Sequence, residues 1–185
     1  MKKTIALCGA HGTGKTTLLK LLEQQYKLTP LTRTVRTFWE DSGVVDFEKL
    51  PMEVRNIFQK HLLLNQITQE DEAWKNGFIT ERSVLDYIGY TVVSSDMQGV
   101  EKRMFEFLVR ERLRRYDVFV YLPVEFPAKA EYLRAHPGLQ KKVATVLELY
   151  LSEWLEPHQY CIARGSVKER FSQIQSFIDG DNQRY

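Results

Sequence analysis

The stretch from Gly9 to Thr16 has the residue types and the spacing of a phosphate-binding loop. It reads Gly-Ala-His-Gly-Thr-Gly-Lys-Thr and matches the pattern G-x-x-x-x-G-K-[ST]. Its glycines allow positive φ, so successive backbone N–H groups can point inward at an anion. We expect Lys15 to bridge the outer phosphates of a nucleoside triphosphate and Thr16 to be a magnesium ligand. The candidate nucleotide-binding residues of this segment are Gly9, His11, Gly12, Thr13, Gly14, Lys15, Thr16 and Thr17.

The segments on either side of this loop are those that the motif requires. Thr4–Cys8 is a continuous apolar run typical of a buried parallel strand, and leucines at helical spacing follow the loop. The helix adds its positive dipole end to the phosphate site. Within the loop, we interpret His11 as a spacer near the phosphates, with a catalytic role as the alternative. Thr17 is a further candidate for contact with the α-phosphate.

A second candidate site follows the apolar strand Phe78–Thr80, where the chain reads Glu81-Arg82-Ser83. A carboxylate at the end of a strand beside the phosphate loop can complete a magnesium shell, so we expect Glu81 to hold magnesium directly or through water. The planar guanidinium of Arg82 can brace either a phosphate or the acceptor. Asp86 is open to two compatible interpretations, a catalytic base and the partner of Ser83 in a helix capping box.

The phosphate loop, Glu81-Arg82-Ser83 with Asp86, and Tyr90-Thr91 together resemble the kinases of the deoxynucleoside and thymidylate kinase group. They are also similar to small, often phage-encoded P-loop kinases with an Asp/Glu-Arg-Ser-x-x-Asp motif, including 5-hydroxymethyluracil DNA kinases. Ala163–Ser166, followed by Glu169-Arg170, is similar to the loop that cups the adenine in these families. The resemblance implies that ATP is the donor and that its adenine lies against Arg164, Gly165 and Ser166.

The acceptor side departs from this resemblance. Deoxynucleoside kinases carry a Glu at the end of the second strand as the base that activates the acceptor hydroxyl, whereas residues 31–36 here read Leu-Thr-Arg-Thr-Val-Arg. The acceptor is therefore either already ionised, as in a nucleotide kinase, or activated by another carboxylate, with Asp86 as the first candidate. Arg33, Arg36 and Trp39 form the candidate acceptor-binding cluster, because guanidinium groups grip phosphate and an aromatic ring stacks on a base. The alternative is a solvated loop with one buried aromatic ring.

Two further basic segments have alternative interpretations. Residues 130–142 are a candidate lid, with Arg134 as the arginine that stabilises the transferring phosphoryl group and Ala135–Gly138 as a turn between two helices. Lys141-Lys142 fits either the lid or a solvated helix start. The run Arg110–Arg115 is either an exposed helix end or a patch that attracts a polyanion.

Apolar runs predict the strands that position these motifs, at residues 4–8, 28–32, 78–80, 118–122 and 160–163. Helices are expected after the phosphate loop, at about 51–75, from 84 to beyond 92, at 100–115, along 143–154 and after Ser166. Strands alternating with helices predict an α/β fold, a doubly wound parallel sheet of about five strands with helices on both faces, as one domain over residues 1–185. Ligands of such sheets bind at the carboxyl ends of the strands, where the motifs fall.

The composition indicates the cellular environment of the protein, but it does not indicate which acceptor the protein uses. The 185 residues carry a formal net charge of +2, which neither demands nor excludes a nucleic-acid partner. Cys8 and Cys161 lie far apart in apolar runs and read as buried, reduced thiols of a cytoplasmic protein, in a bacterial or phage-infected cell. No apolar run is long enough to span a membrane, and we expect a monomer or a homodimer.

These features together predict an ATP- and Mg²⁺-dependent kinase that moves the γ-phosphoryl group to a deoxynucleoside or a nucleoside monophosphate. An alternative acceptor is a 5-hydroxymethyluracil base, or another hydroxyl, in phage DNA, which would require direct contact with DNA. A further alternative is an NTP-hydrolysing switch that acts through a protein partner. The acid–arginine–serine triplet fits acceptor chemistry better than it fits a switch.

Overall fold

A computed structural model describes residues 3–31, 49–126 and 137–181, together with the single positions 35, 37, 41 and 43. The strands in these ranges are β1 (Thr4–Cys8), β2 (Thr29–Pro30), β3 (Phe78–Thr80), β4 (Val118–Tyr121) and β5 (Tyr160–Ile162). The α-helices are α1 (Lys15–Tyr26), α3 (Met52–Ala73), α4 (Val84–Ser94), α5 (Gly99–Leu113), α6 (Pro137–Trp154) and α7 (Val167–Asp181). Short 3₁₀ helices precede β3 and β5, namely η2 (Trp74–Asn76) and η4 (Pro157–Gln159).

The five strands form one sheet in the order β2-β3-β1-β4-β5, and each of the pairings is parallel. On one side of β1, Ala6 lies opposite Thr80 of β3; on the other side, Cys8 lies opposite Tyr121 of β4. The predicted α/β fold with a five-stranded parallel sheet is confirmed. Because β1 and β3 are parallel neighbours, the loop after β1 and the turn after β3 leave the sheet side by side at the same edge.

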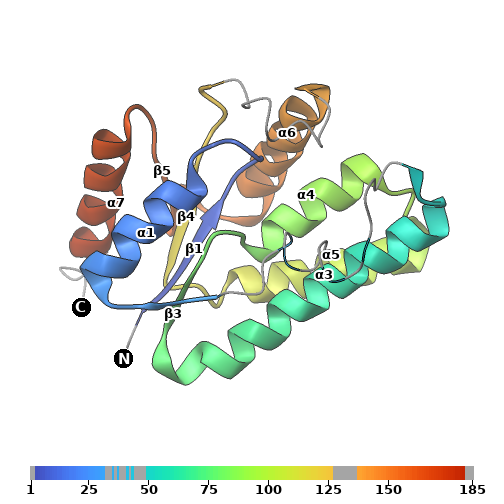
Figure 1. Ribbon diagram of the computed structural model, residues 1–185, viewed down its shortest axis with the longest axis horizontal. Helices are drawn as coiled ribbons and strands as arrows, with labels where there is room; N and C mark the ends of the chain where they lie inside the picture. The colour runs from blue at the N-terminus through green and yellow to red at the C-terminus, as the bar shows by residue number, and fades with distance from the viewer. Residues whose placement is uncertain are drawn as a thin grey trace.

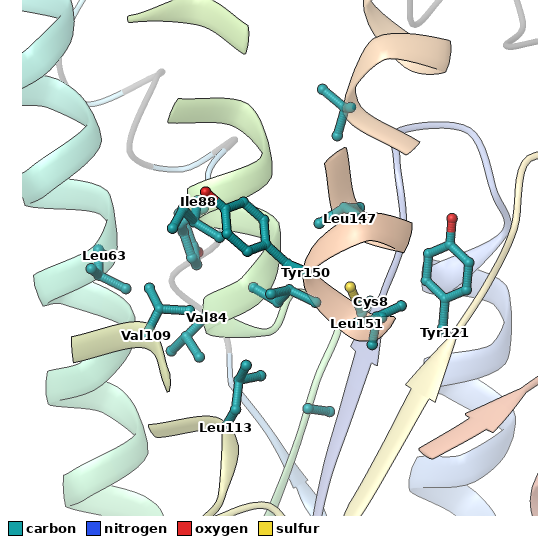
Figure 2. Packing of buried hydrophobic residues seen from close by; sticks show 14 of the residues in the cluster. Cys8, Leu63, Val84, Ile88, Val109, Leu113, Tyr121, Leu147, Tyr150 and Leu151 are labelled. Carbon is teal, nitrogen blue, oxygen red and sulfur yellow. The ribbon is translucent and has the colours of Figure 1, made fainter. Parts of the chain in front are cut away.

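Side chains alternate along the strands between two helical layers. Ile5 and Leu7 face a cluster built with α1 and α7, whereas Ala6 and Cys8 face a larger cluster built with α3, α4, α5 and α6. Figure 1 shows α1 and α7 on one side of the sheet and α3, α4, α5 and α6 on the other. Figure 2 shows part of the larger cluster, where Cys8 of the sheet lies near Leu151 of α6. Since both faces are covered, the strands read as continuous apolar runs.

Several element boundaries lie where the sequence signals place them. α3 begins directly after Pro51, and the chain leaves η2 at Gly77, whose φ is 70°. Ser83 caps α4 in a complete capping box with Asp86. At α7, the Ser166 hydroxyl accepts from the backbone N–H of Glu169, and the Glu169 carboxylate accepts from the backbone N–H of Ser166. These caps fix the starts of the two helices that follow the candidate site segments.

Other boundary predictions need correction. β2 is shorter than the predicted strand at residues 28–32, because it is an edge strand that pairs with β3 alone. The predicted turn at Ala135–Gly138 is wrong in its second half, since α6 begins at Pro137 and proline suits the first turn of a helix. Ala135 and His136 lie outside the described residues. Within the part of the chain that the structure describes, no helix has the length and apolar character needed to cross a membrane.

α4 and α6 approach closely at Gly89, which makes this glycine a test of the packing. A Cβ at this position would lie 2.7 Å from Cδ2 and 3.1 Å from Cγ of Leu147, a fully buried residue. We expect Gly89→Val to lower the free energy of unfolding by about 1–3 kcal/mol, the usual cost of overpacking a core, as measured by urea unfolding. Gly138→Val is the matched control, because a Cβ on Gly138 of α6 meets nothing within 4 Å. Equal losses in the two variants would contradict the close approach.

Candidate functional site

The loop between β1 and α1 has a backbone that requires glycine. Gly9, Gly12 and Gly14 have φ values of 150°, 75° and 88°. A Cβ on Gly9 would lie 2.5 Å from the backbone oxygen of Leu122, so the chain passes too close to the end of β4 to carry a side chain there. Gly14 is the N-cap of α1 and leaves the first backbone N–H groups of that helix available to an anion. The loop therefore has the conformation of an anion nest.

Lys15 is buried inside this loop. Its Nζ donates to the backbone oxygens of Gly9 at 2.5 Å and Ala10 at 2.8 Å. Burial lowers the pKa of Lys15 to about 8; Asp86 opposes the shift and Arg82 adds to it. A phosphate would offer the ammonium group a charged acceptor in place of the two carbonyl groups. The lysine is thus held where a phosphate bound by the loop would lie.

Thr16 and Glu81 meet across the gap between α1 and β3. The Thr16 hydroxyl donates to Oε2 of Glu81 at 2.8 Å. Thr16 is exposed and Glu81 is half-buried, so both oxygen atoms are open to a ligand. A hydroxyl and a carboxylate oxygen are the hard ligands that Mg²⁺ takes alongside water and phosphate oxygens. The structure brings together the two residues that the sequence predicts as magnesium ligands, and their chemistry fits that ion.

Asp86 ties the phosphate loop to α4. Its side chain has no exposed surface; Oδ1 accepts the backbone N–H of Gly9 at 3.0 Å, and Oδ2 accepts both the N–H and the hydroxyl of Ser83 at 2.8 Å. The predicted capping role is confirmed, and the contact with Gly9 is one that the sequence did not predict. Since both oxygen atoms are occupied and buried, the geometry favours a positioning role over that of a base.

Arg82 and Tyr90 form the wall of the site on the side of α4. The Arg82 guanidinium lies over the Tyr90 ring, 4.9 Å from its centroid. The Tyr90 hydroxyl in turn accepts the backbone N–H of His11 at 3.0 Å. Gln140 of α6 donates to the backbone oxygen of His11 at 2.7 Å. The loop is therefore held from α4 and α6 as well as from its own strand and helix.

The turn after β5 contains Arg164, Gly165 and Ser166, the candidate adenine-binding residues, and it is connected to the phosphate loop through Arg170. Gly165, with φ 90°, donates its N–H to Glu125 at 2.8 Å. Arg170 is 2% exposed, and it donates to Glu125 at 2.5 Å and to the backbone oxygen of Thr13 at 2.6 Å. Arg170 and the Gly165 N–H together lower the pKa of Glu125. The sequence signal for this link is the Glu169-Arg170 pair, whose contact with the loop was not predicted.

A buried network of hydrogen bonds connects the turn after β3 to α3. Glu70 of α3 accepts from Gln66 at 2.8 Å and from the Tyr116 hydroxyl at 2.6 Å. Gln66 also donates to Thr80 at 3.1 Å, and the Tyr116 oxygen accepts the backbone N–H of Val84 at 3.2 Å. Burial raises the pKa of Glu70 to about 7, against the lowering effect of the two hydrogen bonds. Both ends of the Glu81-Arg82 turn are thus fixed to α3.

The remaining candidate residues divide into those the structure places and those it does not. Arg33, Arg36, Trp39 and Arg134 lie outside the described residues, so their predicted roles stay predictions. Lys141 and Lys142 are exposed on α6, and Thr17 is exposed on α1. The Arg110–Arg115 run is not a simple exposed helix end, because Arg112 is buried and donates to Asp71 at 2.7 Å.

A parallel sheet with a phosphate-binding loop after β1, and with an acid and an arginine after β3, defines an α/β P-loop nucleotide-binding protein. A family model described as AAA domain (AAA_28) matches residues 4–170. The chain belongs to this family. No curated protein matches it.

Solved structures with the same fold include nucleoside and nucleotide kinases. A deoxyadenosine kinase from M. mycoides, with products dCMP and a flexible dCDP bound, is 17% identical with a TM-score of 0.71, over 97% of this chain and 99% of that one. A NadR protein in complex with NR is 14% identical with a TM-score of 0.73, over 95% and 51%. Thymidylate kinase from Candida albicans is 13% identical with a TM-score of 0.63, over 99% and 93%. These likenesses support the P-loop kinase fold.

The Asp86 carboxylate gives a direct test of how the loop is held. Asp86→Asn replaces an acceptor-only group by an amide, so one of the buried donors, Gly9 N–H or Ser83, faces an NH₂ group. We expect a loss of about 1–3 kcal/mol in the free energy of unfolding, the cost of a buried unsatisfied donor, together with a smaller thermal shift on adding ATP. Urea unfolding and thermal melts with and without nucleotide measure the two effects. Asp179→Asn, at an exposed position of α7, is the control; a wild-type ATP shift in Asp86→Asn would refute the anchoring role.

Proposed function

We propose that the protein is an ATP-dependent phosphotransferase that moves the γ-phosphoryl group to a deoxynucleoside or a nucleoside monophosphate. The observation that carries the proposal is the contact between Thr16 and Glu81 beside the buried Lys15. It supports a metal-binding pair at the phosphate loop. The strand order β2-β3-β1-β4-β5 puts the turn that carries Arg82 and the candidate adenine turn after β5 on opposite sides of β1. A site with donor and acceptor sides is what transfer requires, whereas hydrolysis alone needs only the first.

On the donor side, each group has a defined task. Backbone N–H groups of the loop and of the first turn of α1 bind the phosphates, and Lys15 neutralises their charge. Thr16 and Glu81 would hold Mg²⁺, which supplies further charge neutralisation when bound. The turn at Arg164–Ser166 is proposed to hold the adenine, and Arg170 fixes that turn relative to the loop through Glu125. Phosphoryl transfer is governed by such positioning and electrostatics.

On the acceptor side, Arg82 is proposed to bind the acceptor or the transferring phosphoryl group, held by its contact with Tyr90. Gln59 of α3 is a further candidate for the acceptor side, and the sequence analysis did not identify it. It is 5% exposed, its Nε2 donates to Ser94 of α4 at 3.2 Å, and its Oε1 has no partner among the described residues. An amide oxygen left free between α3 and α4 is suited to the polar edge of a base. The deoxynucleotides bound in the M. mycoides structure, dCMP and dCDP, contain a base of this kind.

A base within DNA is the alternative acceptor, and it would need unpaired cations around an open site. In the Arg110–Arg115 run, Arg112 and Arg115 pair with Asp71, and Arg114 pairs with Glu111. These pairs reduce the charge available to a polyanion. The arrangement of these ion pairs therefore favours a free nucleoside or nucleotide as the acceptor. DNA is included as a separate acceptor in the assay described next.

The decisive assay offers γ-labelled ATP and Mg²⁺ with separate acceptors: nucleosides, nucleoside monophosphates, plain DNA and 5-hydroxymethyluracil DNA. We expect label in a free nucleoside or nucleotide. Lys15→Ala is expected to lower the transfer rate roughly 100-fold or more, the effect of removing one preorganised charge donor. Lys20→Ala, an exposed lysine of α1, is the matched control and should retain wild-type transfer. Label found only as inorganic phosphate with every acceptor would refute the proposed function.

The metal-binding pair is tested separately by varying Mg²⁺. We expect Glu81→Gln to raise the Mg²⁺ concentration for half-maximal transfer by roughly 10-fold or more, because the amide replaces a charged oxygen ligand. Chelation by EDTA should stop transfer in the wild type. An unchanged Mg²⁺ dependence in Glu81→Gln would show that this carboxylate is not a ligand.

A further inference from the structure

The side chain of His11 makes specific contacts although it lies at a variable position of the phosphate loop. Its backbone N–H donates to the Tyr90 hydroxyl oxygen at 3.0 Å, and its Nδ1 lies 3.1 Å from the same oxygen. The ring centroids of His11 and Tyr90 are 6.4 Å apart. The imidazole is therefore turned out of the loop and toward α4, on the side of the site that carries Arg82.

The hydrogen bonds of Tyr90 favour one tautomer of the His11 ring. The Tyr90 oxygen accepts the His11 backbone N–H and a hydrogen bond from the Arg82 side chain, so its hydroxyl hydrogen is the group left for Nδ1. Nδ1 then accepts, and the hydrogen of the neutral ring lies on Nε2. Burial, together with the charges of Lys15 and Arg82, lowers the pKa of His11 to about 4, so the ring is neutral at physiological pH.

Nε2 is left as a buried donor without a partner among the described residues. Such a group costs free energy unless a ligand supplies an acceptor atom. The loop interior, with Lys15 and the backbone N–H groups, already serves the phosphates of the nucleotide. The candidate adenine turn, with Arg170 and Glu125, lies across the loop on the side of β5 and α7. The contact of Nδ1 with Tyr90, whose ring lies against the Arg82 guanidinium, puts the imidazole on the side of Arg82, the proposed acceptor side.

We propose that Nε2–H of His11 donates a hydrogen bond to an oxygen atom of the acceptor molecule, with Tyr90 holding the ring in the required tautomer. His11 and Tyr90 then form an acceptor-binding pair beside Arg82, in addition to the nucleotide contacts of the loop backbone. A neutral donor suits this place, because Lys15 and Arg82 already supply positive charge. The inference rests on the proposed function for the identity of the ligand and assigns His11 to the acceptor rather than to ATP.

Two substitutions of His11 distinguish the role of Nδ1 from that of Nε2. In His11→Asn, the amide oxygen can still accept from Tyr90, but no donor reaches the position of Nε2. In His11→Gln, the longer side chain places an amide N–H near that position. In the transfer assay we expect His11→Asn to raise the acceptor KM roughly 10-fold, equivalent to one lost hydrogen bond, and to leave the KM for ATP within about twofold. His11→Gln should restore most of the acceptor KM.

A loss in His11→Asn that falls on the KM for ATP, or an acceptor KM equal to that of the wild type, would overturn the inference. If the wild type transfers phosphate and His11→Asn behaves identically, the inference fails while the proposed function stands. If the wild type transfers to no acceptor, the proposed function fails, and the inference is then decided by a readout that needs no turnover.

That readout is ¹⁵N NMR of the histidine side chains in the 185-residue chain. The chain has 4 histidines, and the His11 signals are those absent from His11→Asn. We expect the Nε2–H tautomer at pH 7, its loss of preference in Tyr90→Phe, and a shift of the Nε2 signal when a nucleoside or nucleoside monophosphate is added with Mg²⁺ and a non-hydrolysable ATP analogue. An Nδ1–H tautomer, or an Nε2 signal that moves with no acceptor, would overturn the inference.

Discussion

The carboxylate of Asp86 is the interaction on which the site depends. It has no exposed surface and accepts three hydrogen bonds, one from the loop after β1 and two from the residue that caps α4. The phosphate loop and the Glu81-Arg82 turn come from two adjacent strands, and this single group fixes their relative position. A buried charge is tolerated there because both oxygen atoms are satisfied by donors. The phosphate loop and the Glu81-Arg82 turn are therefore held as one unit.

The rest of the structure extends this rigidity around the loop. Tyr90 of α4, Gln140 of α6 and Arg170 of α7 each bond to its backbone, at His11 or at Thr13. The helices on both faces of the sheet thus hold the same short segment. A nest of N–H groups binds an anion well only if its dipoles are already oriented, since reorientation would cost part of the binding free energy. The packing of α3, α4, α5 and α6 against one face and of α1 and α7 against the other supplies that orientation.

The sequence predicted the parts of this arrangement that depend on local patterns. Gly9–Thr16 has a fixed spacing, the strands are continuous apolar runs, and Ser83 with Asp86 is a capping box; each signal lies within a few residues. The contacts of Asp86 with Gly9 and of Arg170 with Thr13 join residues far apart in the chain, so no local pattern encodes them. The same reason explains why neither interpretation of the Arg110–Arg115 run, an exposed helix end or a polyanion patch, included the burial of Arg112, since that burial depends on α3. The contact of the His11 ring with Tyr90 of α4 likewise joins residues far apart in the chain.

The burial of Lys15 links the protonation of this residue to phosphate binding in the loop. With its ammonium group buried and bonded only to neutral carbonyls, its pKa is about 8, below that of a free lysine. A phosphate in the loop would stabilise the charged form and raise that pKa, so nucleotide binding takes up protons at mildly alkaline pH. The contribution of Lys15 to phosphate binding would then decrease as the pH rises above about 8. The burial that orients Lys15 would therefore also make its charge at mildly alkaline pH depend on whether a phosphate is bound.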